Sequence, residues 1–377
     1  MATKRENLLR TLRNEPADYI PIVVACDPYN QPSREGMPAK LAEQLGEVRW
    51  KDNSPVTLAR WLDLEVSVRS APPIRGRSTR SRQRQERVGD EHHIIITTPS
   101  GEIREVRRQG HAGAADYAVK RFVETEADLK VFAEFMADQT FEIVLAEVAT
   151  VSERLRFVGN DGMLAISMPG TPLGMMVRVY SGVEALAYFC ADCPDTLAST
   201  LEIVSDNYLR QLRLLADVPA DAVWSVDDTS TTAISPAMFE TYEMGHIDRA
   251  ATEVQRQGKL YLHHSCGLIR DLLGLYRRTR MDVVDAVNPP PMGNTPIDVA
   301  LEQLGPDIAI IAAMPQLRID PFDHDEVRRS LDESFAQAGD GRNLVLGMAG
   351  EQNRTIADME FLVAECRKRR QGRSRRS

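Results

Sequence analysis

The feature that most constrains the fold is a series of short apolar runs that alternate with helical patterns along the 377-residue chain. Such runs predict strands, and helices between successive strands predict βαβ units with a parallel sheet. Eight runs are present: Ile20–Cys26, Glu65–Ala71, Met163–Met168, Ala222–Asp227, Lys259–Ser265, Asp282–Val287, Ile308–Met314 and Asn343–Met348. Eight strands in one chain favour a closed (β/α)8 TIM barrel of the α/β class over an open doubly wound sheet.

The segments between these runs carry the 3.6-residue periodicity of helices. The clearest helical patterns are Gly182–Leu215, Ser235–Gln257, Leu268–Arg278, Pro296–Leu304 and Asp325–Ala338. No segment stands apart as a second alternating unit, so we expect one barrel domain over residues 1–377.

One segment, Pro72 to Glu147, interrupts the alternation between the second and third barrel strands. Within it, His92–Arg107 predicts a β-hairpin around a glycine turn, and Thr125 is suited to cap a following helix. We expect this insertion to serve as a lid or a dimerisation flap.

Basic residues gather at two places. Six arginines lie between Arg75 and Arg87, and a second basic run forms the tail, residues 367–377. A solvated loop and a frayed terminus are the ordinary interpretations of such runs. The functional alternative is a mobile arm that captures an anionic substrate or a partner protein.

Composition disfavours several classes of protein. The net charge of -9 and a pI near 5.4 argue against nucleic acid as the main partner. No apolar run approaches the roughly 18 residues of a membrane helix, and the first residues do not resemble a secretory signal. The five cysteines are scattered, which predicts a cytoplasmic location. Neither of the common glycine-rich nucleotide-binding motifs is present.

The fifth apolar run ends in Leu262-His-His-Ser-Cys-Gly. Side chains on a strand alternate between faces, so His264 and Cys266 should project together while His263 and Ser265 project the other way. An imidazole beside a thiol is half of a zinc site, or an activated thiol.

Other polar residues stand where the remaining runs end. Because the chemistry of (β/α)8 barrels lies at the carboxyl ends of the strands, these residues should share one rim with the His-x-Cys pair. They are Cys26, Asp27, Asp227, Asp228, Asn288, Gln316 and Glu351. Such a rim could bind zinc or perform acid–base chemistry. A structural alternative for the Asp227–Asp228 pair is that one of them caps the next helix.

Several segments resemble, in order and spacing, the uroporphyrinogen decarboxylase superfamily, and together they span most of the chain. They are Lys4-Arg-Glu-Asn-Leu-Leu, Asp18-Tyr-Ile-Pro, Met168-Pro-Gly-Thr-Pro-Leu-Gly, Ser225-Val-Asp-Asp, Ile234-Ser-Pro-Ala-Met-Phe, Leu262-His-His-Ser-Cys-Gly and Met281-Asp-Val-Val-Asp. The resemblance implies a (β/α)8 barrel, in agreement with the strand count.

The superfamily has branches that differ in motif. True decarboxylases carry an amino-terminal Met-Arg-Gln-Ala-Gly-Arg-like segment whose arginines hold substrate carboxylates, whereas this chain has Val24-Ala-Cys-Asp-Pro-Tyr-Asn. Another branch transfers methyl groups to or from corrinoid proteins and binds zinc through His-x-Cys and a later cysteine. His264-Ser-Cys266 matches the first part, but Leu346-Gly-Met-Ala-Gly-Glu351 lacks the later cysteine.

The resemblance therefore implies a zinc-assisted methyltransferase that moves a methyl group between a small methylated substrate and a corrinoid (cobalamin) on a partner protein. His264 and Cys266 would bind the metal. Asp228 and Glu351 would be catalytic, either as proton donors or by completing the metal shell, for which Cys26 is a further option. A homodimer would be unremarkable for such a barrel.

Two alternatives remain at this point. One is a lyase acting on a tetrapyrrole or another polycarboxylate, with Asp27 stabilising a protonated ring and the arginines from Arg75 to Arg87 replacing the missing ones. The other is a barrel that has lost catalysis and serves as a binding module, because fold does not fix function.

Overall fold

Eight parallel strands close into a barrel in the computed structural model, which describes residues 2–24, 33, 35–45, 54–110, 116–227, 229–314, 322–348 and 354–374. Around the barrel the strands are β1 (Ile22–Val24), β14 (Leu344–Met348), β13 (Ala309–Ala313), β12 (Val283–Val287), β11 (Leu260–Ser265), β10 (Ala222–Asp227), β9 (Gly162–Met168) and β2 (Glu65–Ser70). All eight predicted strands are confirmed, and so is the α/β TIM-barrel class.

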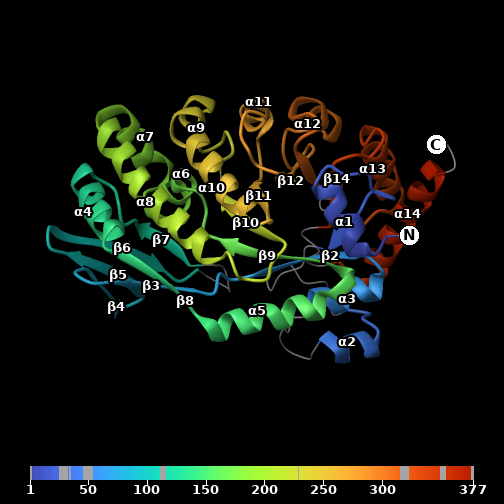
Figure 1. Cartoon of the computed structure of the whole chain (residues 1–377), viewed down its shortest axis with the longest axis horizontal. Helices are drawn as coiled ribbons and strands as arrows, with labels where there is room; N and C mark the ends of the chain where they lie inside the picture. Colours follow the sequence, from blue (N-terminus) through green and yellow to red (C-terminus); the bar gives the residue numbers. More distant parts are fainter. Residues whose placement is uncertain are drawn as a thin grey trace.

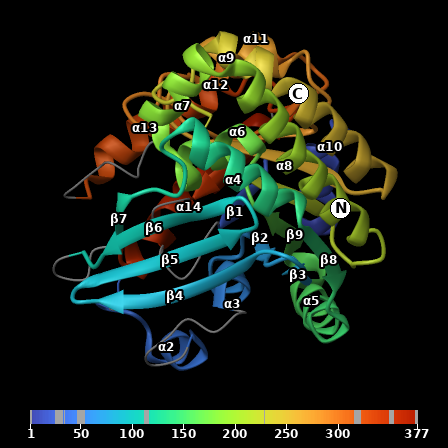
Figure 2. The ribbon, with the colours of Figure 1, turned by 90° about the vertical axis from the view of Figure 1, so that its left-hand side faces the viewer.

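Helices surround this barrel (Figures 1 and 2). They are α1 (Lys4–Leu12), α2 (Ala39–Leu45), α3 (Ser54–Leu62), α5 (Leu145–Val158), α6 (Pro172–Met175), α7 (Gly182–Asp192), α8 (Pro194–Leu214), α9 (Pro236–Tyr242), α10 (Met244–Arg256), α11 (Leu273–Tyr276), α12 (Ile297–Leu304), α13 (His324–Gln337) and α14 (Ile356–Ser374). Among the described residues, no helix combines the length and apolar character that crossing a membrane requires.

Three predicted helices differ from the structure. The pattern over 182–215 divides into α7 and α8 because Pro194 lacks the N–H that would continue the first helix. The pattern over 235–257 divides into α9 and α10 at Glu243. The pattern over 268–278 contains only a 3₁₀ turn, Arg270–Leu272, and the single turn of α11.

Side-chain alternation separates two cores. Inward-facing residues such as Val23, Leu262 and Val283 fill the barrel, and Leu8 and Leu12 of α1 pack into the same cluster. The outward-facing residues pack beneath the surrounding helices in a larger cluster. Polar side chains on inward positions must therefore share the barrel interior with aliphatic ones.

The insertion between β2 and β9 is built on β-sheet. Strand β3 (Ile74–Ser78) pairs with β8 (Gln139–Ile143), and β4 (Arg82–Val88), β5 (Glu91–Thr98), β6 (Gly101–Arg108) and β7 (Tyr117–Lys120) form a second sheet, seen face-on in Figure 2. Helix α4 (Glu126–Ala137) packs on β5 and β6. The predicted hairpin and the Thr125 cap are confirmed.

Both basic segments are more ordered than the loop and frayed tail predicted from the sequence. The arginines from Arg75 to Arg87 lie on or beside the exposed strands β3 and β4. The start of the basic tail belongs to α14, where Arg367 bonds to Asp63 and Arg369 to Asp332. The arginines of β3 and β4 are solvated as predicted, whereas Arg369 in α14 is mostly buried, and pairing with carboxylates or with a neighbouring strand fixes the backbone in both segments.

One carboxylate ties the insertion together. Asp138, at the end of α4, accepts hydrogen bonds from the backbone N–H groups of Thr79, Arg80 and Ser81 at 3.1, 2.8 and 2.7 Å, and from the Thr79 hydroxyl at 2.6 Å. These bonds, foremost those from Thr79 and Ser81, hold the pKa of Asp138 well below its ordinary value despite opposing desolvation. The connection between β3 and β4 therefore depends on an ionised group.

We predict that acid loosens this connection. A carboxyl whose pKa is depressed by folding contributes stability above its unfolded pKa, near 4, and that stability is lost as the pH falls below it. Hydrogen exchange of the β4 and β5 amides, corrected for intrinsic rates, should show wild-type protection falling below about pH 4. Asp138→Asn should already be less protected at neutral pH.

The matched control is Glu142→Gln, which removes an exposed ion pair with Arg77 in the same insertion. It should leave the protection of β4 and β5 unchanged. Equal protection in Asp138→Asn and wild type would contradict the assigned role of Asp138.

Candidate active site

Four side chains from four strands meet inside the barrel. Arg69 comes from β2, Trp224 from β10, His264 from β11 and Asp285 from β12. The Asp285 Oδ2 atom accepts from Trp224 Nε1 at 2.5 Å, and lies 2.9 Å from His264 Nδ1 and 3.4 Å from Arg69 Nη2. We call these four residues the Asp285 cluster.

Ring contacts complete the Asp285 cluster. The Arg69 guanidinium lies 3.5 Å from the ring centroid of Trp224, a cation–π contact, and the rings of Trp224 and His264 meet edge to face at 4.9 Å. Arg69, Trp224 and Asp285 line a small pocket whose other walls are Val23, Ser67, Ala165, Leu262 and Ile311. The pocket therefore combines polar side chains, held in place by their mutual contacts, with mainly apolar walls inside the barrel.

Mutual contact sets the charges of His264 and Asp285. Burial favours the neutral form of each, but the hydrogen bond between them, aided by Cys266 on the histidine side, raises the pKa of His264 to about 9. Burial likewise opposes ionisation of Asp285, yet His264 and Arg69 lower its pKa to about 2. In the absence of metal, the pair is an imidazolium and a carboxylate at neutral pH.

Cys266 follows β11 and is exposed. Its side chain lies near enough to that of His264 to help raise the pKa of the imidazole, so the two are neighbours at the end of β11. The imidazole is one-fifth exposed. A ligand approaching the carboxyl end of β11 can therefore reach both the sulfur and the ring.

Most of the other predicted rim residues lie outside the part of the chain that the structure describes. Asp228 and Glu351, predicted to be catalytic, lie outside the described residues, as do Cys26, Asp27 and Gln316. Among the described residues, no set of three or more His, Cys, Asp or Glu side chains is arranged to hold a metal. Their proposed roles stay predictions.

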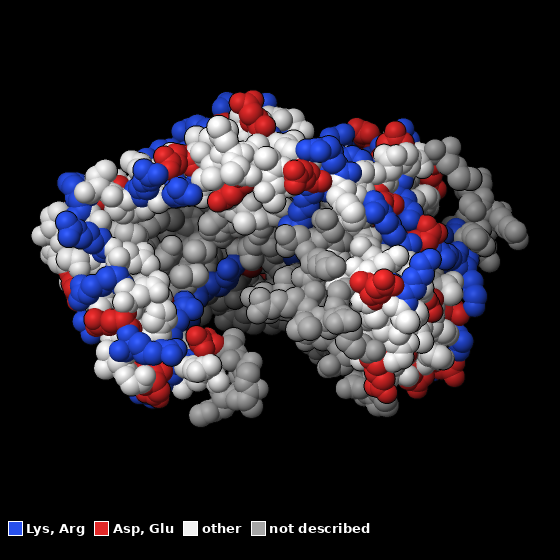
Figure 3. All heavy atoms as spheres, turned by 90° about the horizontal axis from the view of Figure 1, so that it is seen from below, with Lys and Arg blue, Asp and Glu red and all other residues white. Residues whose placement is uncertain are grey.

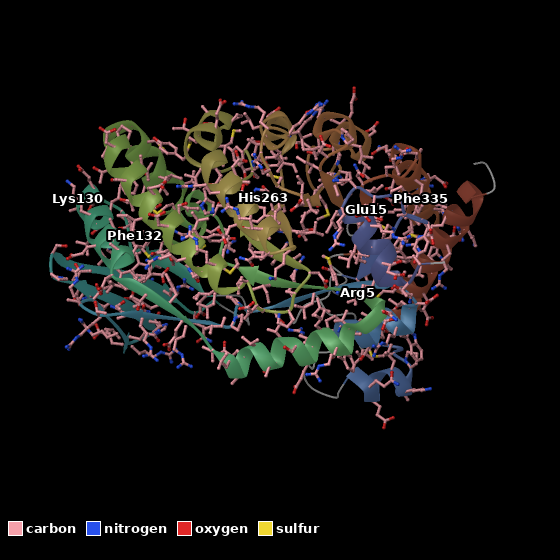
Figure 4. All side chains as sticks on the ribbon, viewed as in Figure 1. Arg5, Glu15, Lys130, Phe132, His263 and Phe335 are labelled. Atoms are coloured by element: carbon pink, nitrogen blue, oxygen red, sulfur yellow. The ribbon has the colours of Figure 1, made fainter. Side chains whose placement is uncertain are left out.

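Asp227 is not a mouth residue, so that part of the rim prediction is wrong. Its carboxylate is fully buried on the outer face of the barrel, where it accepts from the Thr171 N–H and hydroxyl at 2.5 and 2.6 Å. His263, labelled in Figure 4, lies with Nδ1 3.2 Å from Asp227 and is also fully buried. A Cβ at Gly174 would lie 2.8 Å from an Asp227 oxygen, so this carboxylate needs glycine beside it.

Three members of the Asp285 cluster were missed by the sequence analysis: Arg69, Trp224 and Asp285. The available signal was a charged residue within an apolar run, at a position that alternation turns inward. Arg69 interrupts the second run and Asp285 the sixth in this way. Charged side chains are seldom buried without partners, so each of these positions pointed to a partner across the barrel.

We predict that Asp285 makes the stability of the metal-free protein depend on pH. Because folding raises the pKa of His264, its stabilisation is complete below about pH 6.5, the ordinary imidazole value, and is lost as the pH rises through about 9. Urea unfolding should show a loss of about 2 kcal/mol over this range, the order of a charge-assisted hydrogen bond.

Asp285→Asn should abolish that alkaline loss, whereas Asp271→Asn, at an exposed position, should retain it. An unchanged alkaline loss in Asp285→Asn would contradict the assignment.

Comparison with known proteins places the chain in a family. The family model for uroporphyrinogen decarboxylase matches residues 114–349. A solved methyltransferase from Methanosarcina mazei is similar over 98% of this chain and 99% of its own, with 14% identity and a TM-score of 0.61. That likeness extends the shared fold over almost the whole chain.

More distant barrels include D-psicose 3-epimerase from Clostridium cellulolyticum, which is 11% identical over 60% of this chain and 83% of its own, with a TM-score of 0.35. A xyloglucanase from Bacteroides ovatus is 9% identical over 81% of this chain and 98% of its own, with a TM-score of 0.38. Comparison with curated protein sequences gave no match. The family model covers more than half of the chain, and the chain therefore belongs to the uroporphyrinogen decarboxylase family.

Proposed function

We propose that this chain is a methyltransferase that moves a methyl group between a small methylated substrate and a corrinoid on a partner protein, with zinc held by His264 and Cys266. The observation that carries the proposal is that the Cys266 side chain lies near enough to His264, at the carboxyl end of β11, to raise the pKa of that imidazole. The M. mazei methyltransferase supports the fold required for this branch, and the His-x-Cys pair supports the choice of branch.

The residues present suit zinc. Asp285 engages Nδ1 of His264, which leaves Nε2 as the nitrogen for a metal. A carboxylate behind a ligating histidine is a common arrangement, because it fixes the ring and strengthens the ligand. The Cys266 sulfur is exposed and can bind as a thiolate. We propose that Asp228, Glu351 or Cys26 supplies the remaining ligands.

The reaction balances as a two-electron displacement. The bond between methyl and oxygen, nitrogen or sulfur breaks, and the heteroatom keeps the electron pair and takes up a proton. The methyl group forms its new bond with the electron pair of a corrinoid cobalt(I). Zinc, when bound, supplies Lewis-acid polarisation of the leaving heteroatom.

The chain's own residues would prepare this step. Asp285 orients His264, while Trp224 and Arg69 form a floor that keeps water from the substrate side. Asp228 or Glu351 would deliver the proton to the leaving heteroatom. The insertion would act as a lid or dimerisation flap over the site.

Decarboxylation of a tetrapyrrole has less support. That alternative required the arginines from Arg75 to Arg87 to bind substrate carboxylates. Arg77 instead pairs with Glu142 at 2.6 Å, and Arg84 pairs with Glu102 at 3.2 Å, and all four side chains are exposed. Arg77 and Arg84 therefore already have carboxylate partners within the insertion.

We predict that His264→Ala and Cys266→Ala each lower the zinc content and slow methyl transfer to cobalamin(I). Both single variants should lose zinc after dialysis, because each removes a metal ligand. Treatment of the wild type with a chelator should stop transfer, and added zinc should restore it. Metal analysis and the absorbance change of the corrinoid provide the two measurements.

Cys193→Ala is the matched control, because this thiol lies at the end of α7, away from β11, and should retain full zinc and activity. Equal and negligible zinc in the wild type and all variants, after reconstitution with zinc, would refute the metal site.

A further inference from the structure

Arg178 bonds to β10, the strand that neighbours the one carrying His264. It belongs to a π-helical turn, Met176–Tyr180, directly after α6, and its Nη1 donates to the carbonyl of Val226. Val226 on β10 is the register partner of His264 on β11, and neighbouring strands lie about 4.8 Å apart. Single π turns within helices are rare and are frequent at functional sites.

Arg178 is only partly exposed, and none of the described carboxylates forms an ion pair with it. A half-buried cation without a counter-ion is unusual, because desolvation of the charge is then not offset. Arg69, in contrast, has Asp285 within 3.4 Å. Of the two, Arg178 is the guanidinium suited to receive an anion from solution.

Other cations stand close to the same end of the barrel. Arg154 of α5 donates from Nη1 to the Ser70 hydroxyl at 3.2 Å, where β2 ends. From below, the molecular surface is hollowed beside the insertion, and Lys or Arg side chains lie on the described part of its wall (Figure 3). This charge favours a negative ligand group at the mouth over a neutral one.

The insertion holds the turn that presents Arg178. Arg121 donates from Nη1 to the carbonyls of Arg178 and Val179 at 2.8 and 3.1 Å. The Val123 N–H donates to the Tyr180 carbonyl at 3.0 Å. Gly182 has a φ of 82°, and a Cβ there would lie 3.1 Å from Arg121 Nε, so glycine leaves room for this guanidinium.

We propose that Arg178 binds a carboxylate of the methyl-bearing substrate and that Arg121 is its positioning residue. Val226 occupies Nη1, and the edge formed by Nε and Nη2 has the forked geometry that carboxylates accept in pairs. This inference rests on the proposed function and names its substrate class: a small methoxy or N-methyl carboxylic acid, held by its acid group with the methyl toward His264 and Cys266.

The test is calorimetric titration with 4-methoxybenzoate, N,N-dimethylglycine and betaine, each beside its methyl ester. The wild type should bind at least one acid and bind its ester much more weakly. Arg178→Gln should weaken binding of that acid about ten- to hundredfold, the loss expected for a charge-assisted pair. Arg178→Lys should fall between, since it keeps the charge but not the fork.

The matched control is Arg84→Gln, at an exposed insertion arginine paired with Glu102, which should bind like the wild type. Arg121→Gln should weaken binding in the wild-type background but add little to Arg178→Gln, because it acts through that residue. Thermal unfolding verifies that each variant is folded.

Binding of acids and esters with equal strength, no binding of any acid, or unchanged binding by Arg178→Gln would overturn the proposal. The His264→Ala, Cys266→Ala double variant separates it from the methyl-transfer proposal. Carboxylate binding retained in that variant supports Arg178 even if zinc and methyl transfer are absent from the wild type.

Discussion

The Asp285 carboxylate allows polar chemistry to exist inside an aliphatic barrel. An isolated charge there would be neutralised or excluded, because desolvation in a poorly polarisable interior costs several kcal/mol per ion. Asp285 avoids this cost by receiving the Trp224 N–H, the His264 imidazolium and the Arg69 guanidinium at once. Without the Asp285 carboxylate, the His264 imidazolium and the Arg69 guanidinium would lose their common partner.

The same strand also carries a second polar system on its other face. His263 lies against Asp227, and Glu243, at the junction of α9 and α10, is buried close by. Burial, with the charge of Asp227 added, raises the pKa of Glu243 well above its ordinary value, so the pair carries one negative charge in preference to two. This outer system fastens helices to the barrel, whereas the inner one faces the pocket.

Much of the barrel was predictable because each strand is a short apolar run bounded by a turn, and eight of them closed as expected. Side-chain alternation also placed His264 and Cys266 together.

The sequence did not reveal that Asp227 turns outward, because its partner Thr171 lies 56 residues away and no local pattern marks that contact. Arg69 and Asp285 show the same difficulty, because these two side chains pair only where β2 and β12 face each other across the barrel. The arginine-rich segment was mispredicted as a loop for a related reason. Its order comes from pairing with neighbouring strands, and the charge of a segment does not reveal such pairing.

The consecutive histidines of β11 lie on opposite faces of the strand, where His263 contacts Asp227 and His264 contacts Asp285. A strand exchanges its two faces whenever its register moves by one residue. Loss of either Leu260 or Tyr261 would turn the ring now packed against Asp227 toward the pocket and bury the one now facing Asp285. Length changes in β11 should consequently be far more damaging than most substitutions within it. A length change beyond Gly267, after β11 has ended at Ser265, leaves unchanged which imidazole faces the pocket.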